Sequence, residues 1–281
     1  MSTSLSTHFT IHTHTSSPEA AFVNSYWIET TEGIVVIDTQ LVLSEARKLK
    51  QQIAASGQPL AAVIITHPHP DHFNGVGTLL EGLDSIPVYA TQATLDGIKA
   101  TEASKRVQWK GTYGSDYPDT TVLPNTIVAS DETITVGGVL WHFQELGAAE
   151  ASNETVISVD AAKTLFCGDV MYNQVHSWLV EGRTSAWLEQ LGEVLQTYAD
   201  FETIYPGHGQ PATLLAMNEQ VTYLNTYQAL VRGELERAGK LTAASKAAIK
   251  ARIEQQYPAQ WPLAMLVEMN IDGIENELRK K

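Results

Sequence analysis

The sequence has a single cysteine, Cys167, so no disulfide can form within the chain. So low a cysteine content is typical of a reducing compartment, and we expect a cytoplasmic protein. Long apolar runs are also absent, because stretches such as 61–65 are far shorter than the roughly 20 residues that cross a bilayer. Residues 1–6 show neither the basic start nor the apolar stretch of a secretory signal.

Basic residues are scarce as well. The chain has 18 lysines and arginines against 32 aspartates and glutamates, which gives a formal net charge of −14. Proteins that bind nucleic acids need clustered basic side chains to meet the phosphates, and anionic membranes attract basic surfaces. We therefore expect neither nucleic acid nor a membrane as a partner. The hydrophobic share, 43% of 281 residues, is sufficient for a substantial core.

The order of the expected elements indicates the fold class. Apolar or alternating stretches predict strands at 9–14, 21–29, 33–38, 60–66, 88–90, 126–128, 133–136, 139–145, 155–159, 164–167 and 203–205. Helical periodicity predicts helices at 46–53, 72–83, 91–100, 187–198 and from 211 to the end. Two strand-rich blocks, each followed by helices, predict an α+β fold, a sandwich of two sheets with helices outside. We expect this αββα domain to cover 1–210 and a C-terminal helical extension to cover 211–281.

The most informative stretch follows the buried strand expected at 60–66 and reads His67, Pro68, His69, Pro70, Asp71, His72. Each proline keeps the histidine before it out of helical geometry, so this part of the chain is extended. Residues two apart on an extended chain point the same way, and His67 and His69 can therefore converge on one ion. Asp71 and His72 can reach a second ion nearby. Imidazole and carboxylate groups are common ligands of zinc and similar divalent metals.

The pattern H-x-H-x-D-H after a strand resembles the signature of the metallo-β-lactamase superfamily, and the resemblance runs from about 22 to 208. The stretches 24–26 and 35–38 are similar to the family's opening hairpin. Cys167-Gly168-Asp169 resembles the strand end whose aspartate bridges two metals, and 205–209, with His208, resembles the closing loop whose histidine binds the second metal. The resemblance implies an αββα sandwich with metals at one edge, and it implies that Asp169 and His208 are ligands.

One departure from the family pattern concerns the third histidine of the first metal site. The family usually carries Gly-His before the strand that leads to the bridging aspartate, but 146–155 contains no histidine. Glu150 stands in its place, and Glu-Ala-x-x-Glu resembles the alkylsulfatase branch, in which a glutamate binds metal. We expect Glu150 to be the ligand, with Glu154 as the alternative. If both are solvated loop acids, a single-metal enzyme follows.

The resemblance implies a hydrolase that uses two divalent metal ions to activate water. His67, His69 and Glu150 would hold one ion, Asp71, His72 and His208 the other, and Asp169 would bridge them. Oxygen-rich ligation is compatible with zinc and also with manganese or iron. The expected reaction is cleavage of an ester, thioester, lactone, amide, phosphoester or sulfoester of a small molecule, with Asp71 also handling a proton. The alternatives are a catalytically degenerate binding or regulatory protein and a di-iron redox protein of the same fold.

The residues after the bridging aspartate are the candidates for substrate binding: Asn173, His176, Trp178 and Arg183. His176 would donate to the reacting group or to a substrate carboxylate, unless it is a buried histidine bonded to backbone. Arg183 would bind a substrate anion, unless it pairs with Glu181. The aromatic segment 104–124 is either a loop over the site or an ordinary surface loop. The apolar stretch 261–269 either caps the site or forms a homodimer interface.

Overall fold

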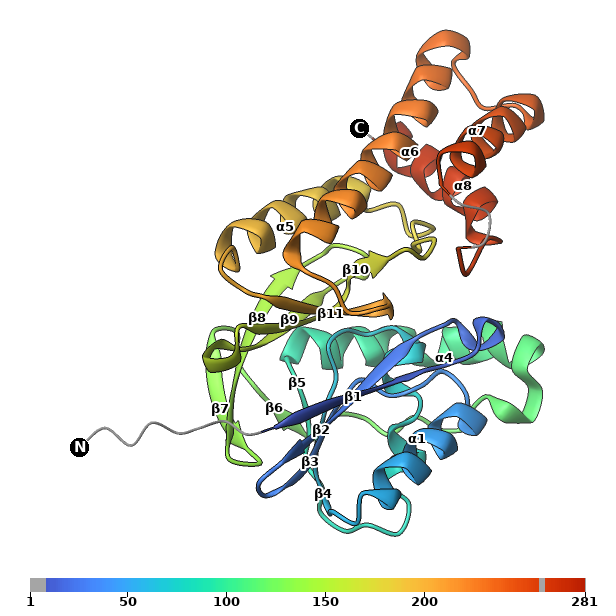
Figure 1. The fold of residues 1–281 in the computed structure, drawn as a ribbon. Helices are drawn as coiled ribbons and strands as arrows, with labels where there is room; N and C mark the ends of the chain where they lie inside the picture. The colour runs from blue at the N-terminus through green and yellow to red at the C-terminus, as the bar shows by residue number, and fades with distance from the viewer. Residues whose placement is uncertain (1–8, 258–260, 281) are drawn as a thin grey trace.

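Two β-sheets pack face to face in the computed structural model, which describes residues 9–257 and 261–280 (Figure 1). The first sheet has the order β1-β2-β3-β4-β5-β6, with β1 (Thr10–Thr15), β2 (Asn24–Thr30), β3 (Gly33–Ile37), β4 (Leu60–Ile64), β5 (Val88–Ala90) and β6 (Thr126–Ile127). The second has the order β11-β10-β9-β8-β7, with β7 (Glu132–Val136), β8 (Val139–Gly147), β9 (Glu154–Val159), β10 (Thr164–Asn173) and β11 (Thr203–Gly209). The predicted αββα sandwich is confirmed.

Successive side chains along the strands of the first sheet pack into two different hydrophobic cores, one on each face of the sheet. On β2, Tyr26 and Ile28 pack between the sheets, where they meet Trp141 and Phe166 of the second sheet. Trp27, between them in sequence, belongs to the opposite core, under the helices. Since successive side chains of a strand point to opposite faces, a strand buried on both faces is apolar throughout, as β3 is.

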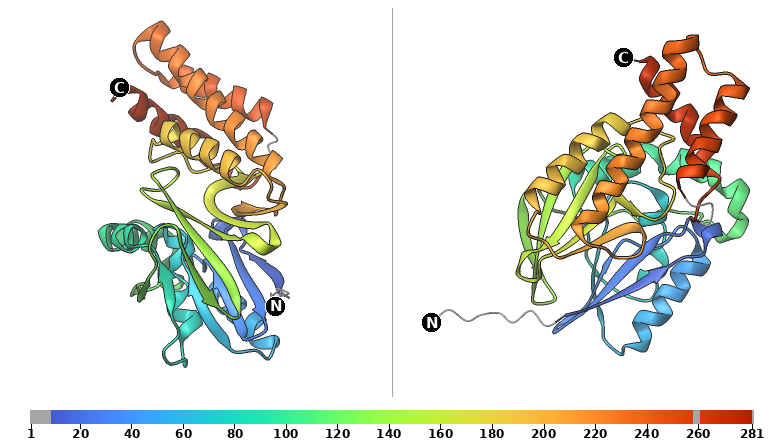
Figure 2. Two further views of the ribbon diagram at one scale, coloured as in Figure 1. Left: turned by 90° about the vertical axis from the view of Figure 1, so that its left-hand side faces the viewer. Right: turned by 45° about the horizontal axis from the view of Figure 1, so that its top comes forward.

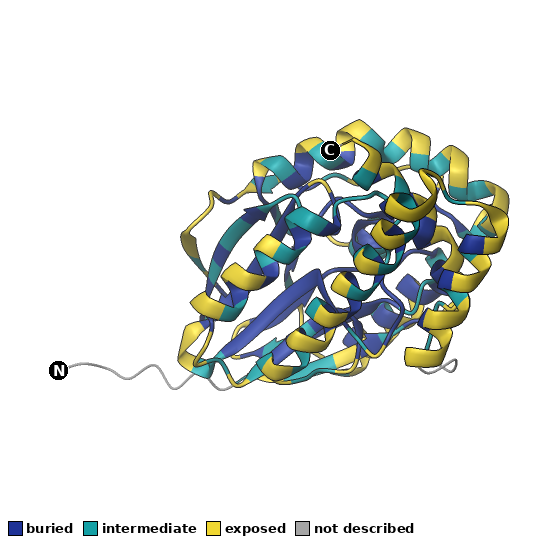
Figure 3. Ribbon diagram, turned by 90° about the horizontal axis from the view of Figure 1, so that it is seen from above, coloured by how far each residue is buried: buried dark blue, intermediate teal, exposed yellow. Residues whose placement is uncertain are grey.

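Helices cover the outer face of each sheet (Figure 2). Strands β3 and β4 run parallel, so the chain must cross over between them, and it does so through α1 (Leu43–Ala55). On the other side, α5 (Thr184–Thr197) packs its apolar stripe on β10. Figure 3 shows the result, with buried strands in the middle and helices that expose their outer faces.

Two helices differ from the sequence-based expectation. The helix expected at 72–83 is divided into α2 (Pro70–Phe73) and α3 (Val76–Leu80). The division follows from Gly75, whose backbone N–H donates to the Thr39 hydroxyl at 3.0 Å instead of to a helical carbonyl. The helix expected at 91–100 extends as α4 (Gln92–Tyr113), so the first half of the supposed loop 104–124 is helical.

The C-terminal extension consists of α6 (Met217–Ala238), α7 (Ala243–Gln256) and α8 (Leu266–Arg279). Helix α8 packs on the segment between β10 and α5. There the Asn270 side chain accepts a hydrogen bond from the Leu179 backbone N–H and donates one to the Ser177 carbonyl, each at 2.8 Å. In the part of the chain that the structure describes, none of the helices has the length and apolar character that a membrane span requires.

His176 lies in the same segment and is buried beneath the extension. Its Nδ1 is 3.1 Å from the Tyr223 hydroxyl, and its ring lies 5.6 Å from that of Trp261. Burial disfavours the charged imidazolium and lowers the pKa of His176 to about 4. The imidazole is therefore neutral in the folded protein at physiological pH.

We predict that His176 makes the protein less stable in mild acid. The unfolded chain takes up this proton near pH 6.5, whereas the folded protein takes it up only near pH 4. Stability is therefore unaffected above pH 6.5 and falls by at most about 3 kcal/mol as the pH decreases toward 4. His176→Asn cannot take up the proton. The loss in the free energy of unfolding relative to the wild type, measured with denaturant, should therefore be smaller at pH 4.5 than at pH 7. The same deficit at both values would contradict this prediction.

Candidate metal centre

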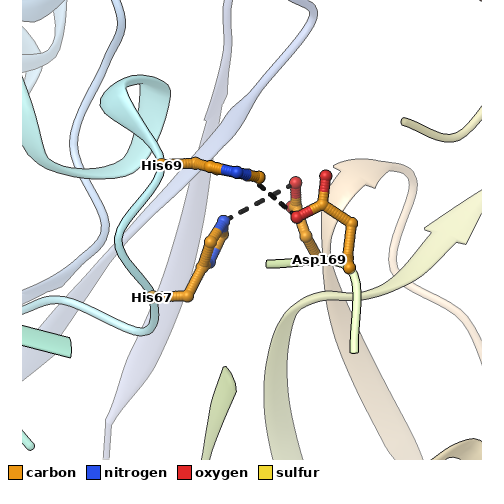
Figure 4. Close-up of side chains that lie close together, drawn as sticks. His67, His69 and Asp169 are labelled. Atoms are coloured by element: carbon orange, nitrogen blue, oxygen red, sulfur yellow. Dashed lines mark ion pairs between the residues drawn. The ribbon is translucent and has the colours of Figure 1, made fainter. Parts of the chain in front are cut away.

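The loop after β4 has the geometry that its prolines predict. His69 is extended, with φ −93° and ψ 142°, and α2 begins immediately after it at Pro70. The His67 and His69 rings lie 5.2 Å apart. His67 Nε2 pairs with Asp169, which comes from β10 of the opposite sheet, and the His69 ring lies beside the same carboxylate (Figure 4). The two sheets therefore contribute to one cluster at the edge of the sandwich.

The seven ligands expected from the sequence lie together. They form two groups that share Asp169, and within each group one possible ligand atom per residue lies within 4.8 Å of the others: His67, His69, Glu150 and Asp169 in the first, and Asp71, His72, Asp169 and His208 in the second. Their side chains are buried except for that of Asp71, which is partly exposed. We refer to these seven residues as the ligand cluster.

The inward-facing atoms of the ligand cluster fit a bound cation. Among the described residues, the buried Nε2 atoms of His67, His72 and His208, and also Glu150 Oε2 and Asp169 Oδ1, have no hydrogen-bond partner outside the ligand cluster, and their polar neighbours are one another. Unsatisfied polar atoms are rarely buried together, since each costs free energy without a partner. Lone pairs of imidazole nitrogen and carboxylate oxygen at one point make a donor set for a divalent metal.

Electrostatics supports the same interpretation. Burial alone would lower the pKa of His208, but the carboxylates of Asp169 and Asp71 raise it to about 10. Burial raises the pKa of Glu150 to about 7. Without a cation the buried carboxylates thus hold protons on themselves or on the neighbouring imidazoles. A divalent ion would displace those protons, as is usual for metal sites.

The outer nitrogens of three histidines are already occupied. His67 Nδ1 lies 2.9 Å from the Thr66 hydroxyl, His72 Nδ1 lies 2.9 Å from Asp38 Oδ2, and His208 Nδ1 lies 3.1 Å from the Phe22 carbonyl. Such contacts fix ring orientation and leave Nε2 free to bind a metal. The sequence analysis missed Asp38 in this role. Its position offered a signal, because it directly follows β3, the parallel neighbour of the strand that precedes His67.

The two glutamates of 146–155 have different positions. Glu150 Oε2 lies 2.8 Å from His69 Nδ1, inside the first ligand group. Glu154 is also buried, but its Oε2 lies 3.5 Å from the outer nitrogen of His67, and it belongs to neither group. Tyr172 was also missed by the sequence analysis: its hydroxyl donates to Asp169 Oδ2 at 2.6 Å, and its ring stacks on His208.

A cavity of about 350 Å³ opens onto the ligand cluster. Its floor includes His69, Asp71, Glu150, Asp169 and His208. Its walls are mostly apolar and come from three parts of the chain: the turn after β1, helix α4 with Trp109 and Tyr113, and the C-terminal extension with Leu263, Met265, Leu266 and Met269. Part of the aromatic segment therefore overhangs the site, and the apolar stretch 261–269 caps it.

The residues expected to bind substrate are placed less uniformly. Trp178 lines the cavity, whereas Asn173, His176 and Arg183 do not. The Asn173 amide donates to the Gln210 carbonyl at 2.7 Å, and Arg183 pairs with Glu181. Arg183 thus forms the pair with Glu181 that was the alternative to substrate binding. His176 is buried, as its alternative expected, but its ring contacts the Tyr223 hydroxyl instead of backbone. Lys105 on α4, which the sequence analysis did not consider, lines the cavity instead.

Known proteins similar to this chain include a linear primary-alkylsulfatase from a Pseudomonas strain, 24% identical over 66% of this chain and 41% of the relative. A probable metallo-hydrolase, YqgX of Bacillus subtilis, is 23% identical over 73% of this chain and 93% of its own length. The chain thus spans less than half the length of the alkylsulfatase. Among solved structures, a beta-lactamase domain protein from Burkholderia ambifaria aligns with a TM-score of 0.72 at 17% identity, covering 96% of this chain and 86% of that one.

The family model for the metallo-beta-lactamase superfamily matches residues 19–208. This range contains all seven residues of the ligand cluster, from His67 to His208, and the strands from β2 onward except the last residue of β11. It ends before α6, so the helical extension that caps the cavity lies outside the match. The fold, the order of the strand-end residues and the match over most of the sequence agree, and the chain belongs to the metallo-beta-lactamase superfamily.

Proposed function

We propose that the protein is a metal-dependent hydrolase that cleaves an ester-type bond in a small molecule carrying an apolar group. One observation carries the proposal: imidazole and carboxylate atoms with no partner outside the ligand cluster converge at a cavity whose walls are apolar. A catalytically degenerate protein is disfavoured, because all seven positions of the ligand cluster carry a side chain that can bind metal. The similarity to an alkylsulfatase and to a probable metallo-hydrolase supports hydrolysis over redox chemistry.

His67, His69 and Glu150 would hold one divalent cation and Asp71, His72 and His208 a second, with Asp169 between them. Bound there, the two cations would supply Lewis-acid activation of water and of the substrate. Two divalent cations would bring four positive charges, and the three carboxylates of the ligand cluster would cancel three of them. One further anion, such as hydroxide, would make the site neutral. Zinc suits this donor set, and its oxygen content also admits manganese or iron.

The protein's own groups have distinct tasks in this reaction. Asp71 is the most exposed carboxylate of the ligand cluster and lines the cavity, so it is placed to accept a proton from the attacking water. Tyr172 holds Asp169 in place through its hydroxyl. The walls formed by Trp109, Trp178 and Met269 would exclude bulk water and bind the apolar part of the substrate.

A sulfate ester of an alkyl chain is the more specific candidate. The similarity to a linear primary-alkylsulfatase supports it, as does Glu150 in place of the family's third histidine. Carboxylic esters, thioesters and lactones with an apolar group fit the same cavity. These substrates share an apolar portion and a bond that activated water can attack.

We predict that Asp169→Asn removes at least one metal ion per chain and lowers kcat/KM by about 100-fold or more, because the shared carboxylate is lost. The measurements are elemental analysis after loading with zinc, and hydrolysis of 4-nitrophenyl esters and dodecyl sulfate. Asp84→Asn, an exposed aspartate away from the cavity, is the matched control. A folded wild type that binds no zinc, manganese or iron would refute the proposal, as would full activity of Asp169→Asn.

We also predict that Met269→Ser weakens turnover of substrates with long apolar groups. Met269 lines the cavity and remains 40% exposed, so the change removes apolar contact surface without opening the core. Losing that contact should lower kcat/KM for 4-nitrophenyl octanoate by roughly 3- to 30-fold while sparing 4-nitrophenyl acetate. Leu215→Ser, an exposed residue outside the cavity, is the control. Equal effects on both esters would show that the wall does not bind the apolar group.

A further inference from the structure

Glu181 lies in the segment between β10 and α5, and helix α8 fixes the backbone on either side of it. On the preceding side, the Asn270 side chain of α8 is hydrogen-bonded to the backbone of Ser177 and Leu179. On the following side Gly182 has φ +65°, and a Cβ on it would lie 2.6 Å from the Gly273 carbonyl oxygen. Only glycine allows so close an approach, so Glu181 sits on a backbone that the extension holds firmly.

The Glu181 carboxylate reaches the ligand cluster directly. Its Oε1 lies 3.0 Å from His69 Nε2 and 3.3 Å from Lys105 Nζ, and its Oε2 pairs with Arg183. The side chain is only 23% exposed. Two cationic side chains, from α4 and from the start of α5, thus keep this carboxylate pointed at one imidazole.

His69 is turned differently from the other histidines of the ligand cluster. His67, His72 and His208 present Nε2 inward, whereas His69 presents Nδ1, which lies 2.8 Å from Glu150 Oε2. If Nδ1 binds a metal, it carries no hydrogen, and the ring hydrogen must be on Nε2. That hydrogen needs an acceptor, and Glu181 Oε1 lies within hydrogen-bond distance.

We propose that Glu181 is a positioning residue for the first metal ion: it accepts the Nε2 hydrogen of His69 and so holds Nδ1 toward that ion. The inference rests on the proposed function, because it assumes that the ligand cluster binds metal. It adds a residue outside the seven ligands and makes the helical extension part of the metal centre. Through Leu179, Gly182 and Asn270, the packing of α8 would reach His69 and tune metal affinity.

A different reading is that Glu181 only joins α4 to α5 by pairing with Lys105 and Arg183. The two readings differ in what a conservative change would do. A purely structural ion pair near the surface contributes little to the free energy of unfolding and leaves metal affinity unchanged. A positioning carboxylate typically contributes 10- to 100-fold to metal affinity.

The experiment measures Zn²⁺ affinity of metal-free protein in competition with a chromophoric chelator, and the absorption spectrum of the Co²⁺-loaded protein. The variants are Glu181→Gln, which keeps an acceptor oxygen but loses the charge, and Glu181→Ala, which loses both. Glu102→Gln is the matched control, because Glu102 lies on α4 and pairs with Arg106 away from the cavity. Circular dichroism of each variant reports whether the fold is kept.

We expect one of two Zn²⁺ affinities to fall by about 10- to 100-fold in Glu181→Ala, with a smaller loss in Glu181→Gln and an altered Co²⁺ spectrum. The second affinity and the Glu102→Gln control should match the wild type. Wild-type affinity at both sites in folded Glu181→Ala would overturn the role of Glu181 while leaving the proposed function intact. A wild type that binds no metal would overturn both. Should Glu181→Ala not fold, Glu181→Gln decides by the same criterion.

Discussion

The structure depends on the packing of three acids, two of them buried and Asp71 partly exposed, against four imidazoles at the edge where the two sheets meet. Neither sheet could bury its share alone, because carboxylates cost several kcal/mol in a low-dielectric interior without partners. Asp169 of the second sheet lies 3.2 Å from both His72 Nε2 and His208 Nε2. His72 follows β4 of the first sheet, so the same contacts join the sheets and assemble the centre.

Backbone geometry makes this close approach possible. A Cβ on Gly207 would lie 1.9 Å from Asp169 Oδ1, so a larger residue there would displace the shared carboxylate. Gly168 has φ +48°, and a Cβ on it would lie 2.8 Å from the Thr66 hydroxyl. The glycines of Cys-Gly-Asp and Pro-Gly-His therefore let β10, β11 and the histidine loop pack closely around one point.

The sequence predicted the ligand cluster better than the substrate side, for a physical reason. The residues of the ligand cluster stand in recognisable local patterns: beside the two prolines of the histidine loop, shortly after β8, or directly after Gly168 and Gly207 within β10 and β11. Such patterns can be read from the sequence. Helix α4 was predicted too short because its last buried residue is Ile98, and its later apolar residues Trp109 and Tyr113 face a cavity instead of a core. Hydrophobic periodicity therefore fades although the helix continues.

The same reasoning explains why Arg183 and His176 were expected at the cavity but lie elsewhere. Their positions depend on the C-terminal extension: His176 lies against Tyr223 of α6 and Trp261. Helix α8, about 90 residues further along the chain, packs on Ser177, Leu179 and Gly182, next to Arg183. No local sequence pattern predicts a contact between segments so far apart in the chain. The packing of the extension holds His176 against Tyr223 and places Glu181 beside His69. The helical extension thus supplies an apolar wall and holds Glu181 against His69. If the ligand cluster binds metal as proposed, changes in the extension would alter substrate choice and metal affinity without touching the seven cluster residues.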